Sequence, residues 1–182
     1  MQRIDSISHP EGKVKILLDN VRQEMGMTPN FLTVLANAPA VLEAFLIFNK
    51  TMNSGKLSPQ LREQLALTIA GYNKCNYCAS AHTAMGSRTG IDSFELHCNL
   101  EGRSSNGKTQ AALQLARALV EKRGKVDQET LQMVKLAGYT NEEIIEIVAH
   151  VGLNTFTNYF NEAIQSHIDF PYISTRKTRN VA

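Results

Sequence analysis

The sequence predicts an all-α protein, and two observations support this prediction. Apolar residues recur at the three- and four-residue spacing of a helix almost throughout the chain, and runs of alternating β-branched residues are absent. Capping residues and helix breakers also divide the chain into segments of helical length. A chain of 182 residues is most simply one domain. Such a domain buries about 70% of its unfolded surface and needs no disulfide for stability.

Three helices are predicted in the N-terminal third, each ended by a glycine, a proline or a turn sequence. They cover residues 14–25, 31–36 and 40–52. An apolar stripe defines the first helix, and Gly26 and Pro29 end it. Pro39 ends the second, because the residue before a proline disfavours helical geometry. An Asn-Ser-Gly turn sequence at residues 53–55 ends the third.

Two helices are predicted on either side of a turn at residues 71–74. Ser58 is a typical N-cap residue and Pro59 suits the first helical position, so one helix is expected from Pro59 to about residue 72. The next helix begins near residue 75 or 76 and ends at Gly90. The two helices are expected to form a hairpin.

Four further helices are predicted in the C-terminal half, at residues 92–100, 107–122, 127–137 and 140–167. The capping-box sequence Thr140-Asn141-Glu142-Glu143 opens the last and longest. Residues 171–182 are expected to form an extended or interface-packed tail, which includes the basic run from Arg176 to Arg179. Residues 1–182 are therefore interpreted as one helical domain.

Charge, hydropathy and cysteine content exclude several classes of protein. The formal net charge is +2 and the basic residues are scattered outside the tail, which argues against a nucleic-acid partner. No apolar run approaches the roughly 20 residues that cross a bilayer, so no membrane association is expected. The first residues do not resemble a signal peptide, and three cysteines do not form a secreted disulfide framework. A cytoplasmic protein is expected.

Residues 63–82 carry the clearest chemical motif. Cys75 and Cys78 have C-x-x-C spacing, close enough on a helix start to form a disulfide. Glu63 lies about 12 Å before the turn and His82 about 10 Å beyond it, measured along two antiparallel helices, so these two side chains should lie at the same depth. His82 follows Cys78 by four residues and therefore shares its helix face.

This order of residues suits thiol chemistry. A carboxylate at Glu63 would orient His82, which could then accept the thiol proton of a cysteine. The resulting thiolate attacks a peroxide to give a sulfenic acid, which the second cysteine converts to a disulfide. Cys78 is the candidate attacking residue because His82 is nearer to it, and Cys75 would resolve the intermediate. The reverse assignment stays open, because the first cysteine of such a pair often has the lower pKa.

The motif of an acid, eleven residues, C-x-x-C, three residues and a histidine resembles that of the AhpD-like alkylhydroperoxidases in the carboxymuconolactone decarboxylase superfamily. Residues 154–161 are also similar to the peroxidase-related members. The resemblance implies an all-helical AhpD-like bundle, a homo-oligomer such as a trimer or hexamer, and thiol-dependent reduction of peroxides or of a partner's disulfide. It also implies that Cys78 forms the sulfenic acid and that Cys75 donates a proton.

One residue departs from the family pattern. Tyr77 occupies the position before the second cysteine, where the best-studied members have histidine. Tyrosine, with a pKa near 10, is a poor proton carrier at neutral pH, so a lower peroxidase activity is expected. Members that lack the cysteine pair are decarboxylases, and the presence of both cysteines argues against lactone decarboxylation here.

Zinc binding is the alternative interpretation of the same residues. Cys75, Cys78 and His82 would need His97 or Cys98 as a fourth ligand, in a helical module that binds a partner and catalyses nothing. The predicted apolar helix around Cys98 favours a buried small side chain at that position instead. The sequence also permits a helical scaffold with an inactive dithiol.

A polar stripe follows one face of the last predicted helix. His150, Asn154, Asn158 and Glu162 recur every four residues. The favoured interpretation is an edge that faces solvent or another subunit, and the alternative is a lining for the dithiol pocket.

No cofactor is predicted, because no glycine-rich dinucleotide motif follows a strand. Electrons would then come from an external thiol reductant, such as a thioredoxin-like or lipoyl protein. The substrate would be a hydroperoxide or a protein disulfide.

Overall fold

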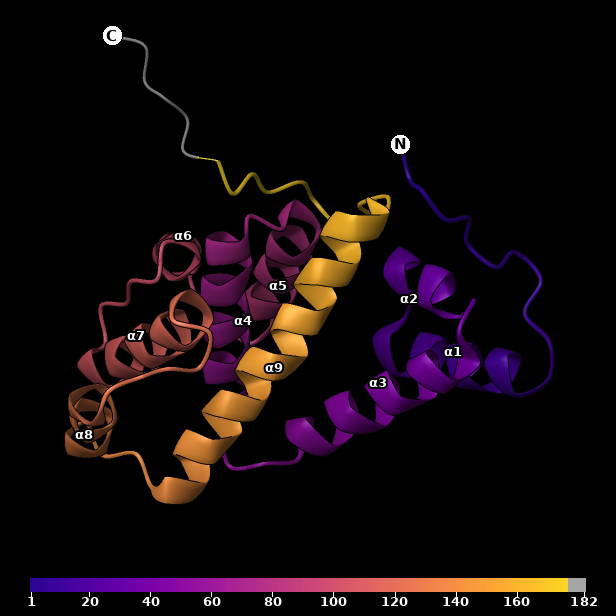
Figure 1. The fold of residues 1–182 in the computed structure, drawn as a ribbon. Helices are drawn as coiled ribbons and strands as arrows, with labels where there is room; N and C mark the ends of the chain where they lie inside the picture. The colour runs from indigo at the N-terminus through magenta and orange to yellow at the C-terminus, as the bar shows by residue number, and fades with distance from the viewer. Residues whose placement is uncertain (177–182) are drawn as a thin grey trace, which may run out of the picture.

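The structure is a computed structural model that describes residues 1–176, so residues 177–182 of the predicted tail lie outside the described part. Nine α-helices and no strands occur in the described residues (Figure 1). The helices are α1 (Gly12–Met25), α2 (Asn30–Leu35), α3 (Pro39–Asn53), α4 (Pro59–Asn73), α5 (Asn76–Arg88), α6 (Ser93–Leu100), α7 (Gly107–Glu121), α8 (Gln128–Leu136) and α9 (Asn141–Ile164). The predicted all-α class is confirmed.

The helix boundaries follow local capping chemistry. The Ser58 hydroxyl accepts a hydrogen bond from the backbone N–H of Leu61 at the start of α4. Thr140 and Glu143 form the predicted capping box of α9. The predicted end of α9 near His167 is wrong by about three residues: Gln165 adopts a left-handed conformation, with φ of 58°, and donates its N–H to the carbonyl of Asn161.

Helix α4 lies at the centre of the molecule and packs against α5, α6, α7 and α9. Its apolar side chains share a core with those of α7, α8 and α9, including Leu65, Ile69, Leu113 and Ile147. Gly71 is required where α4 meets α6, because a Cβ atom there would overlap the carbonyl of Leu100. The middle helices are thus fixed by close packing.

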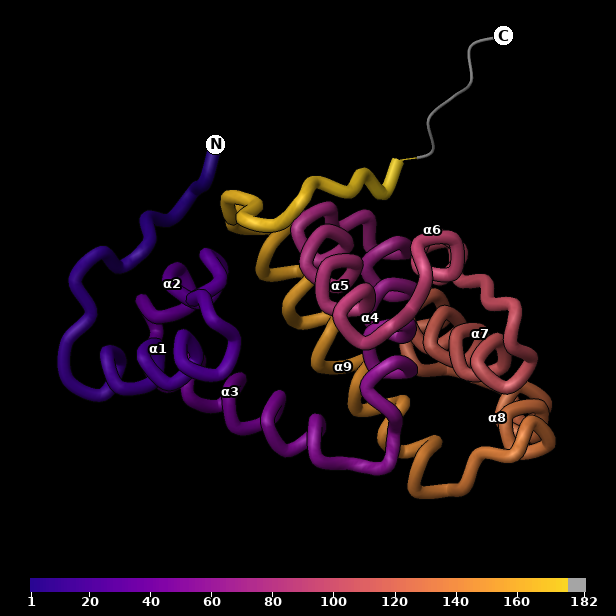
Figure 2. The backbone as a smooth tube through the Cα atoms, turned by 180° about the vertical axis from the view of Figure 1, so that it is seen from behind, coloured from indigo at the N-terminus to yellow at the C-terminus, as the bar shows by residue number. Residues whose placement is uncertain are grey.

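Helices α1, α2 and α3 form a separate group on the other side of α9 (Figures 1 and 2). They have their own buried apolar cluster, which includes Leu18, Leu32 and Leu42. Helix α3 is the member of this group that packs most closely on α9. The N-terminal helices therefore pack against the α4–α9 bundle on the side formed by α9.

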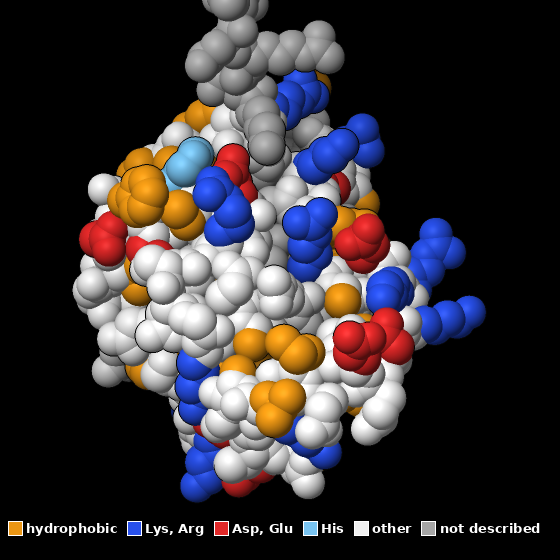
Figure 3. Space-filling model, turned by 90° about the vertical axis from the view of Figure 1, so that its left-hand side faces the viewer, with side chains coloured by type: hydrophobic (Ala, Val, Ile, Leu, Met, Phe, Trp, Pro, Cys, Tyr) orange, Lys and Arg blue, Asp and Glu red, His pale blue; other side chains and the backbone are white. Residues whose placement is uncertain are grey.

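The surface agrees with the sequence composition. No helix within residues 1–176 is both long enough and apolar enough to cross a membrane. Figure 3 shows one face of the molecule, on which Lys and Arg side chains stand at several separate places with Asp and Glu side chains between them.

Candidate active site

The turn between α4 and α5 positions the two cysteines. Lys74 adopts a left-handed conformation, with φ of 59°, and its backbone N–H bonds to the last turn of α4. The N–H of Cys75 then bonds to the carbonyl of Ala70 at 3.0 Å. These bonds end α4 and bring Cys75 to the N-cap position of α5.

The sulfur atoms of Cys75 and Cys78 are in contact. The Cys75 thiol donates a hydrogen bond to the Sγ atom of Cys78 at 2.8 Å, and the Cys75 Sγ atom accepts the backbone N–H of Cys78 at 3.3 Å. Both thiols are free, and the side chains are 0% and 3% exposed, respectively. A disulfide bond of about 2.05 Å needs only a small further approach.

The two thiols differ in acidity. Burial alone would raise the pKa of Cys78, but the hydrogen bond from Cys75, the charge of His82 and the amide of Asn161 outweigh burial and lower it. The pKa of Cys75 is raised, first because its thiol is bonded to Cys78 and second because it is buried. These opposite directions favour Cys78 over Cys75 as the more acidic thiol of the pair.

Glu63 from α4 and His82 from α5 form the second pair. The Glu63 Oε2 atom lies 2.8 Å from His82 Nδ1, and each side chain is about one-fifth exposed. Burial opposes protonation of His82, but the charge of Glu63 and its hydrogen bond prevail and raise the pKa of the imidazole. The imidazole lies one helical turn beyond Cys78 on the same face of α5.

The polar stripe of α9 is buried, so its favoured interpretation as a solvent- or subunit-facing edge is wrong. His150, Asn154 and Asn158 are buried, and only Glu162 is exposed. Asn161 was missed in the sequence, although it lies on the same helix three residues after Asn158. Its Nδ2 atom donates a hydrogen bond to the Sγ atom of Cys78 at 3.6 Å and another to the carbonyl of Thr157 at 3.0 Å.

Asn158 is a second buried amide of α9. Its Oδ1 atom accepts a hydrogen bond of 3.0 Å from Asn73 at the end of α4. Its Nδ2 atom makes no hydrogen bond within the described residues, but it lies close enough to Cys78 to contribute to the lowered pKa of that thiol. Helix α9 thus supplies one hydrogen-bonded amide, that of Asn161, to the Cys78 sulfur.

Tyr77, on α5, contacts both α2 and the segment after α9. Its hydroxyl donates a hydrogen bond of 2.7 Å to Asp169 and accepts the N–H of Phe31 at 3.4 Å. Burial and the bond to Asp169 raise the pKa of the phenol. The ring meets Phe31 and Phe170 edge to face, with centroids 5.8 and 6.0 Å apart. These contacts join the start of α5 to α2 and to the segment after α9.

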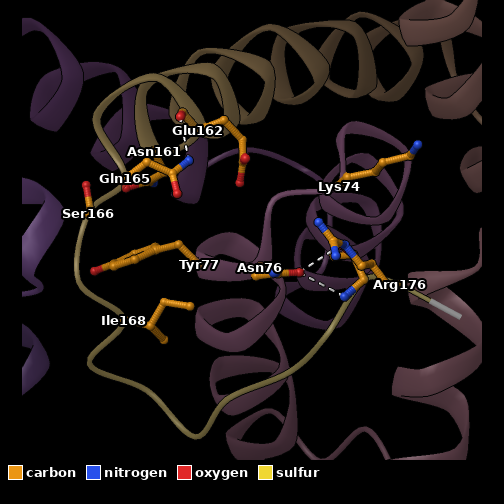
Figure 4. A pocket seen from close by; sticks show the side chains of 10 residues that line it. Lys74, Asn76, Tyr77, Asn161, Glu162, Gln165, Ser166, Ile168 and Arg176 are labelled. Carbon is orange, nitrogen blue, oxygen red and sulfur yellow. Dashed lines mark hydrogen bonds between the residues drawn. The ribbon is translucent and has the colours of Figure 1, made fainter. Parts of the chain in front are cut away.

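The segment after α9 crosses the start of α5. Thr175 donates two hydrogen bonds to Asn76 Oδ1, at 2.9 Å from its backbone N–H and 2.8 Å from its hydroxyl, and Ile173 donates its N–H to Ser80 at 2.9 Å. Figure 4 shows the polar pocket of about 420 Å³ that this segment bounds. Tyr77 and Asn161 line this pocket and also a larger one.

The larger cavity, of about 630 Å³, reaches the reactive sulfur. Cys78, His82 and Glu63 line its inner end, together with His150 and Asn161 from α9. Its outer wall comes from α1, α2 and α3 and combines apolar side chains, such as those of Leu17, Phe31 and Leu46, with polar ones, such as those of Glu43 and Lys50. A molecule in this cavity can reach Cys78 without displacing the C-terminal segment.

The zinc alternative lacks a ligand set. His97 and Cys98 lie on α6, and Cys98 is buried. Within residues 1–176, no group of three or more His, Cys, Asp and Glu side chains is arranged to hold a metal ion. The residues nearest the dithiol are instead an imidazole paired with a carboxylate and two asparagine amides.

Comparison with known proteins identifies the region that holds the site. Residues 39–121 match the family model described as the carboxymuconolactone decarboxylase family. This segment contains Glu63, Cys75, Cys78 and His82. No curated protein matches the chain.

Solved structures share the fold. An uncharacterized peroxidase-related protein from Silicibacter sp. TM1040 superposes with a TM-score of 0.84 at 20% identity, over 96% of each chain. A second such protein, an alkylhydroperoxidase AhpD core from Ralstonia eutropha JMP134, has a TM-score of 0.78 at 19% identity over 88% of this chain and 91% of that one. The debrominase Bmp8 has a TM-score of 0.75 at 23% identity, over 91% of this chain and 93% of that one.

The family match and the shared helical fold agree with the cysteine motif and its neighbouring acid and histidine. Residues 39–121, less than half of the chain, thus match the carboxymuconolactone decarboxylase family, and the described chain has the AhpD-like helical fold.

Proposed function

We propose that the protein is a thiol-dependent oxidoreductase that reduces hydroperoxides or a partner protein's disulfide. Cys75 and Cys78 cycle between dithiol and disulfide in this reaction. The observation that carries the proposal is the pair of sulfur atoms 2.8 Å apart beside a carboxylate and an imidazole that are also 2.8 Å apart. The peroxidase-related relatives agree with a general antioxidant role.

The first step is the activation and attack of Cys78. His82, held by Glu63, takes the thiol proton and becomes an imidazolium, and the Cys78 thiolate then attacks the terminal oxygen of the hydroperoxide. An S–O bond forms as the O–O bond breaks, which leaves a sulfenic acid on Cys78 and an alkoxide. The alkoxide takes the proton from His82 and leaves as an alcohol. The lowered pKa of Cys78 supports its role as the attacking residue.

The second step is resolution by Cys75. The Cys75 sulfur attacks the Cys78 sulfur, an S–S bond forms, and the thiol proton leaves with the hydroxide as water. The raised pKa of Cys75 supports this order of events, because Cys75 stays protonated until the sulfenic acid appears. The hydrogen-bonded contact between the sulfurs favours rapid closure.

An external dithiol restores the reduced enzyme. Two thiol–disulfide exchanges transfer two electrons to the pair and oxidise the donor to its own disulfide. A thioredoxin-like or lipoyl protein has this chemistry. No bound cofactor takes part in this scheme, and the cytoplasmic location expected from the sequence would supply such donors.

Titration with peroxide tests the proposal. One equivalent of cumene hydroperoxide, added anaerobically to the reduced protein, should remove two of the three thiols and leave Cys98 free for alkylation. Cys75→Ser should instead accumulate a sulfenic acid that dimedone traps on Cys78. Cys98→Ser is the control and should lose both of its thiols. If Cys75 and Cys78 of the folded protein remain alkylatable after peroxide treatment, the proposal is wrong.

Reductive dehalogenation is a second candidate. The likeness to the debrominase Bmp8, of which one structure holds a tribromopyrrole, and the large cavity at Cys78 favour it. The same dithiol could supply two electrons to a carbon–bromine bond, with protonation of the carbon, release of bromide and formation of the disulfide. Incubation of the reduced protein with a bromopyrrole should then release bromide in step with thiol loss. Thiol loss with peroxide but no bromide release would exclude this candidate.

The homo-oligomer implied by the family resemblance is also a proposal. Exposed apolar side chains on α3 and α9, among them Ile47, Phe48, Val148 and Tyr159, are suited to a subunit interface. Light scattering coupled to size exclusion measures the mass directly. A trimer or hexamer is expected, and a monomer at micromolar concentration would contradict this.

A further inference from the structure

We infer that the start of α5 binds an extended segment of the protein that donates electrons to the dithiol. The binding surface is the face of α5 that carries Asn76 and Ser80, next to Cys75. Residues 172–176 occupy this surface until the donor displaces them. The inference rests on the proposed function, because it names the way in which a protein dithiol reaches the oxidised pair.

Cys75 is the sulfur that the donor must reach. Thiol–disulfide exchange is faster when the leaving thiol has the lower pKa. The pKa of Cys78 is lowered and that of Cys75 is raised, so attack on Cys75 with release of Cys78 is favoured. Cys75 is 0% exposed and lines neither of the two pockets described above. The larger cavity therefore admits a small molecule to Cys78 but does not bring a donor protein to Cys75.

The C-terminal segment covers this end of the dithiol. Figures 1 and 2 show the chain after α9 running across one end of α5. Ile168, Phe170 and Ile173 pack against the buried cluster that contains both cysteines. Every residue from 167 to 176 is nevertheless at least partly exposed, and residues 172–175 form no helix or strand. Segments with few buried contacts open at a low cost in free energy, so this cover can be displaced.

The segment contacts α5 through its backbone, as a bound peptide would. The N–H of Ile173 donates to Ser80 Oγ and the N–H of Thr175 donates to Asn76 Oδ1, each at 2.9 Å. Alternate N–H groups of an extended chain point to the same side, about 6.6 Å apart. Side chains four residues apart on one helix face lie about 6 Å apart along the axis. Helix α5 thus presents two acceptors at the repeat of an extended backbone.

Both acceptors need a partner when the segment leaves. The Ser80 hydroxyl already donates to the Asn76 carbonyl at 2.8 Å, so its oxygen is directed to accept from the segment. Asn76 Oδ1 accepts the Thr175 hydroxyl at 2.8 Å as well as the backbone N–H. Loss of these bonds has a cost that a replacement segment removes, because its own N–H groups fill the same positions. Backbone recognition of this kind tolerates many side chains.

The fitting donor is a protein dithiol with an extended segment beside its reactive cysteine. An aliphatic side chain at the position of Ile173 would pack against the cysteine cluster in the same way. The donor thiolate attacks the Cys75 sulfur, the bond to Cys78 breaks, and Cys78 leaves as a thiolate. The donor's second thiol then attacks the mixed disulfide, gives its proton to the Cys75 sulfur and leaves the donor as a disulfide. Two electrons pass to the pair.

Two shortened chains test the cover. A chain that ends at Pro171 lacks Ile173 and Thr175 but keeps the bonds of Asp169 to Tyr77 and Asn30. A chain that ends at Arg176 lacks only residues outside the described part and is the control. Each is oxidised with cumene hydroperoxide and then reduced with a bacterial thioredoxin or with dithiothreitol, and the regained thiols are counted by alkylation.

The two reductants should respond differently. Thioredoxin should reduce the chain that ends at Pro171 at least about tenfold faster than the control, because the cover is absent. Dithiothreitol is small enough to enter the larger cavity, so its rates should agree within about threefold. Equal thioredoxin rates for the two chains, zero included, would overturn the inference. Equal acceleration of both reductants would also overturn it, since general loosening of the dithiol would then be the cause.

A serine variant tests binding at the uncovered surface. In the chain that ends at Pro171, Ser80→Ala should lower the thioredoxin rate about three- to tenfold, as expected for one lost hydrogen bond, and leave the dithiothreitol rate unchanged. Ser87→Ala is the matched control, because Ser87 is an exposed serine of the same helix. Equal thioredoxin rates in the two variants would mean that the segment only covers the dithiol and that no donor binds there.

Further outcomes separate this inference from the proposed function. Should the chain that ends at Pro171 fail to fold, Ile173→Asp in the full chain replaces it, with Ser174→Asp as the control because Ser174 is exposed. If peroxide oxidises the pair but the thioredoxin rates do not change, the inference is wrong and the function stands. If peroxide leaves the thiols intact, the function is wrong, and oxidation with diamide allows the same comparison of chain ends.

Discussion

The helices around the dithiol and the helices at the N-terminus are packed in different ways. In α4, buried residues occur on nearly every face, and α4 contacts four other helices. In α1 only Leu18 and Val21 are buried, and α3 buries only Leu42. A closely packed bundle therefore holds the reactive groups, whereas a loosely packed group forms the opposite wall of the cavity.

Polar contacts join the two regions near one end of the cavity. Asp169 accepts the N–H of Asn30 at 2.8 Å and the hydroxyl of Tyr77 at 2.7 Å. The C-terminal segment thus connects the start of α2 to the start of α5. The remainder of the wall depends mainly on apolar contacts between α3 and α9.

The largest expected effect comes from a substitution of the reactive cysteine in the α4–α9 bundle. Cys78→Ser removes the proposed nucleophile and should lower peroxide turnover at least about 10³-fold. Turnover can be followed with dithiothreitol as the electron donor. Cys98→Ser, in a buried position on α6, should keep the parent rate. Similar rates for Cys78→Ser and the parent would assign the reaction to another group.

The next largest effect tests whether helices α1–α3 unfold independently of the α4–α9 bundle. Leu42 is fully buried in their cluster, so Leu42→Ala should cost about 2–5 kcal/mol. We expect this loss to appear as local opening, with faster amide exchange in residues 12–53 and little change in α4. Ile69→Ala is the matched core variant, since Ile69 is also fully buried but lies in the α4 core. It should speed exchange throughout the molecule. The same exchange pattern in both variants would show that the regions unfold together.

The sequence was sufficient to predict how the reactive side chains are arranged, because these residues lie close together in the chain. The helix class and the start of α4 at Ser58 follow from spacing and capping within a few residues of each position. The contact between Glu63 and His82 could also be predicted, because the turn at residues 71–74 sets the relation of two neighbouring helices. The catalytic roles of these residues remain proposals.

The sequence was insufficient where distant segments meet. The period of α9 places His150, Asn154 and Asn158 on one face, but it does not reveal that α4 and α5 cover that face. A polar face on a helix usually indicates solvent, and here it is buried, with Asn161 near one end bonded to the Cys78 sulfur. Tyr77 is another example, because its partner Asp169 lies 92 residues away.

A smaller effect tests the electrostatics of the bundle. Glu63→Gln removes the charge that raises the pKa of His82, so that pKa should fall and the pKa of Cys78 should rise. The reactive pair needs a thiolate and an imidazolium. Activity should therefore begin at higher pH and decline at lower pH than in the parent, so that the active pH range narrows. We expect the maximal kcat/KM to fall about 10- to 100-fold.

Glu121→Gln provides the control for this profile, because Glu121 pairs with Arg117 in an exposed position. Its profile of kcat/KM against pH should match that of the parent. An unchanged profile in Glu63→Gln would mean that the carboxylate only positions the imidazole and does not set its charge.

The smallest effect concerns the amides of α9. Asn161→Ala removes the N–H group that lies 3.6 Å from the Cys78 sulfur, so the pKa of Cys78 should rise and turnover at neutral pH should fall about three- to tenfold. Ultraviolet absorbance of the thiolate against pH measures this pKa without any ligand in the cavity. Asn154→Ala is the control, because it removes a comparable hydrogen bond within α9, from Asn154 to the His150 carbonyl at 2.9 Å. This variant should leave the pKa of Cys78 unchanged. If both variants shift that pKa equally, the effect comes from loosening of α9, and the thiolate owes its stability to α5 and His82 alone.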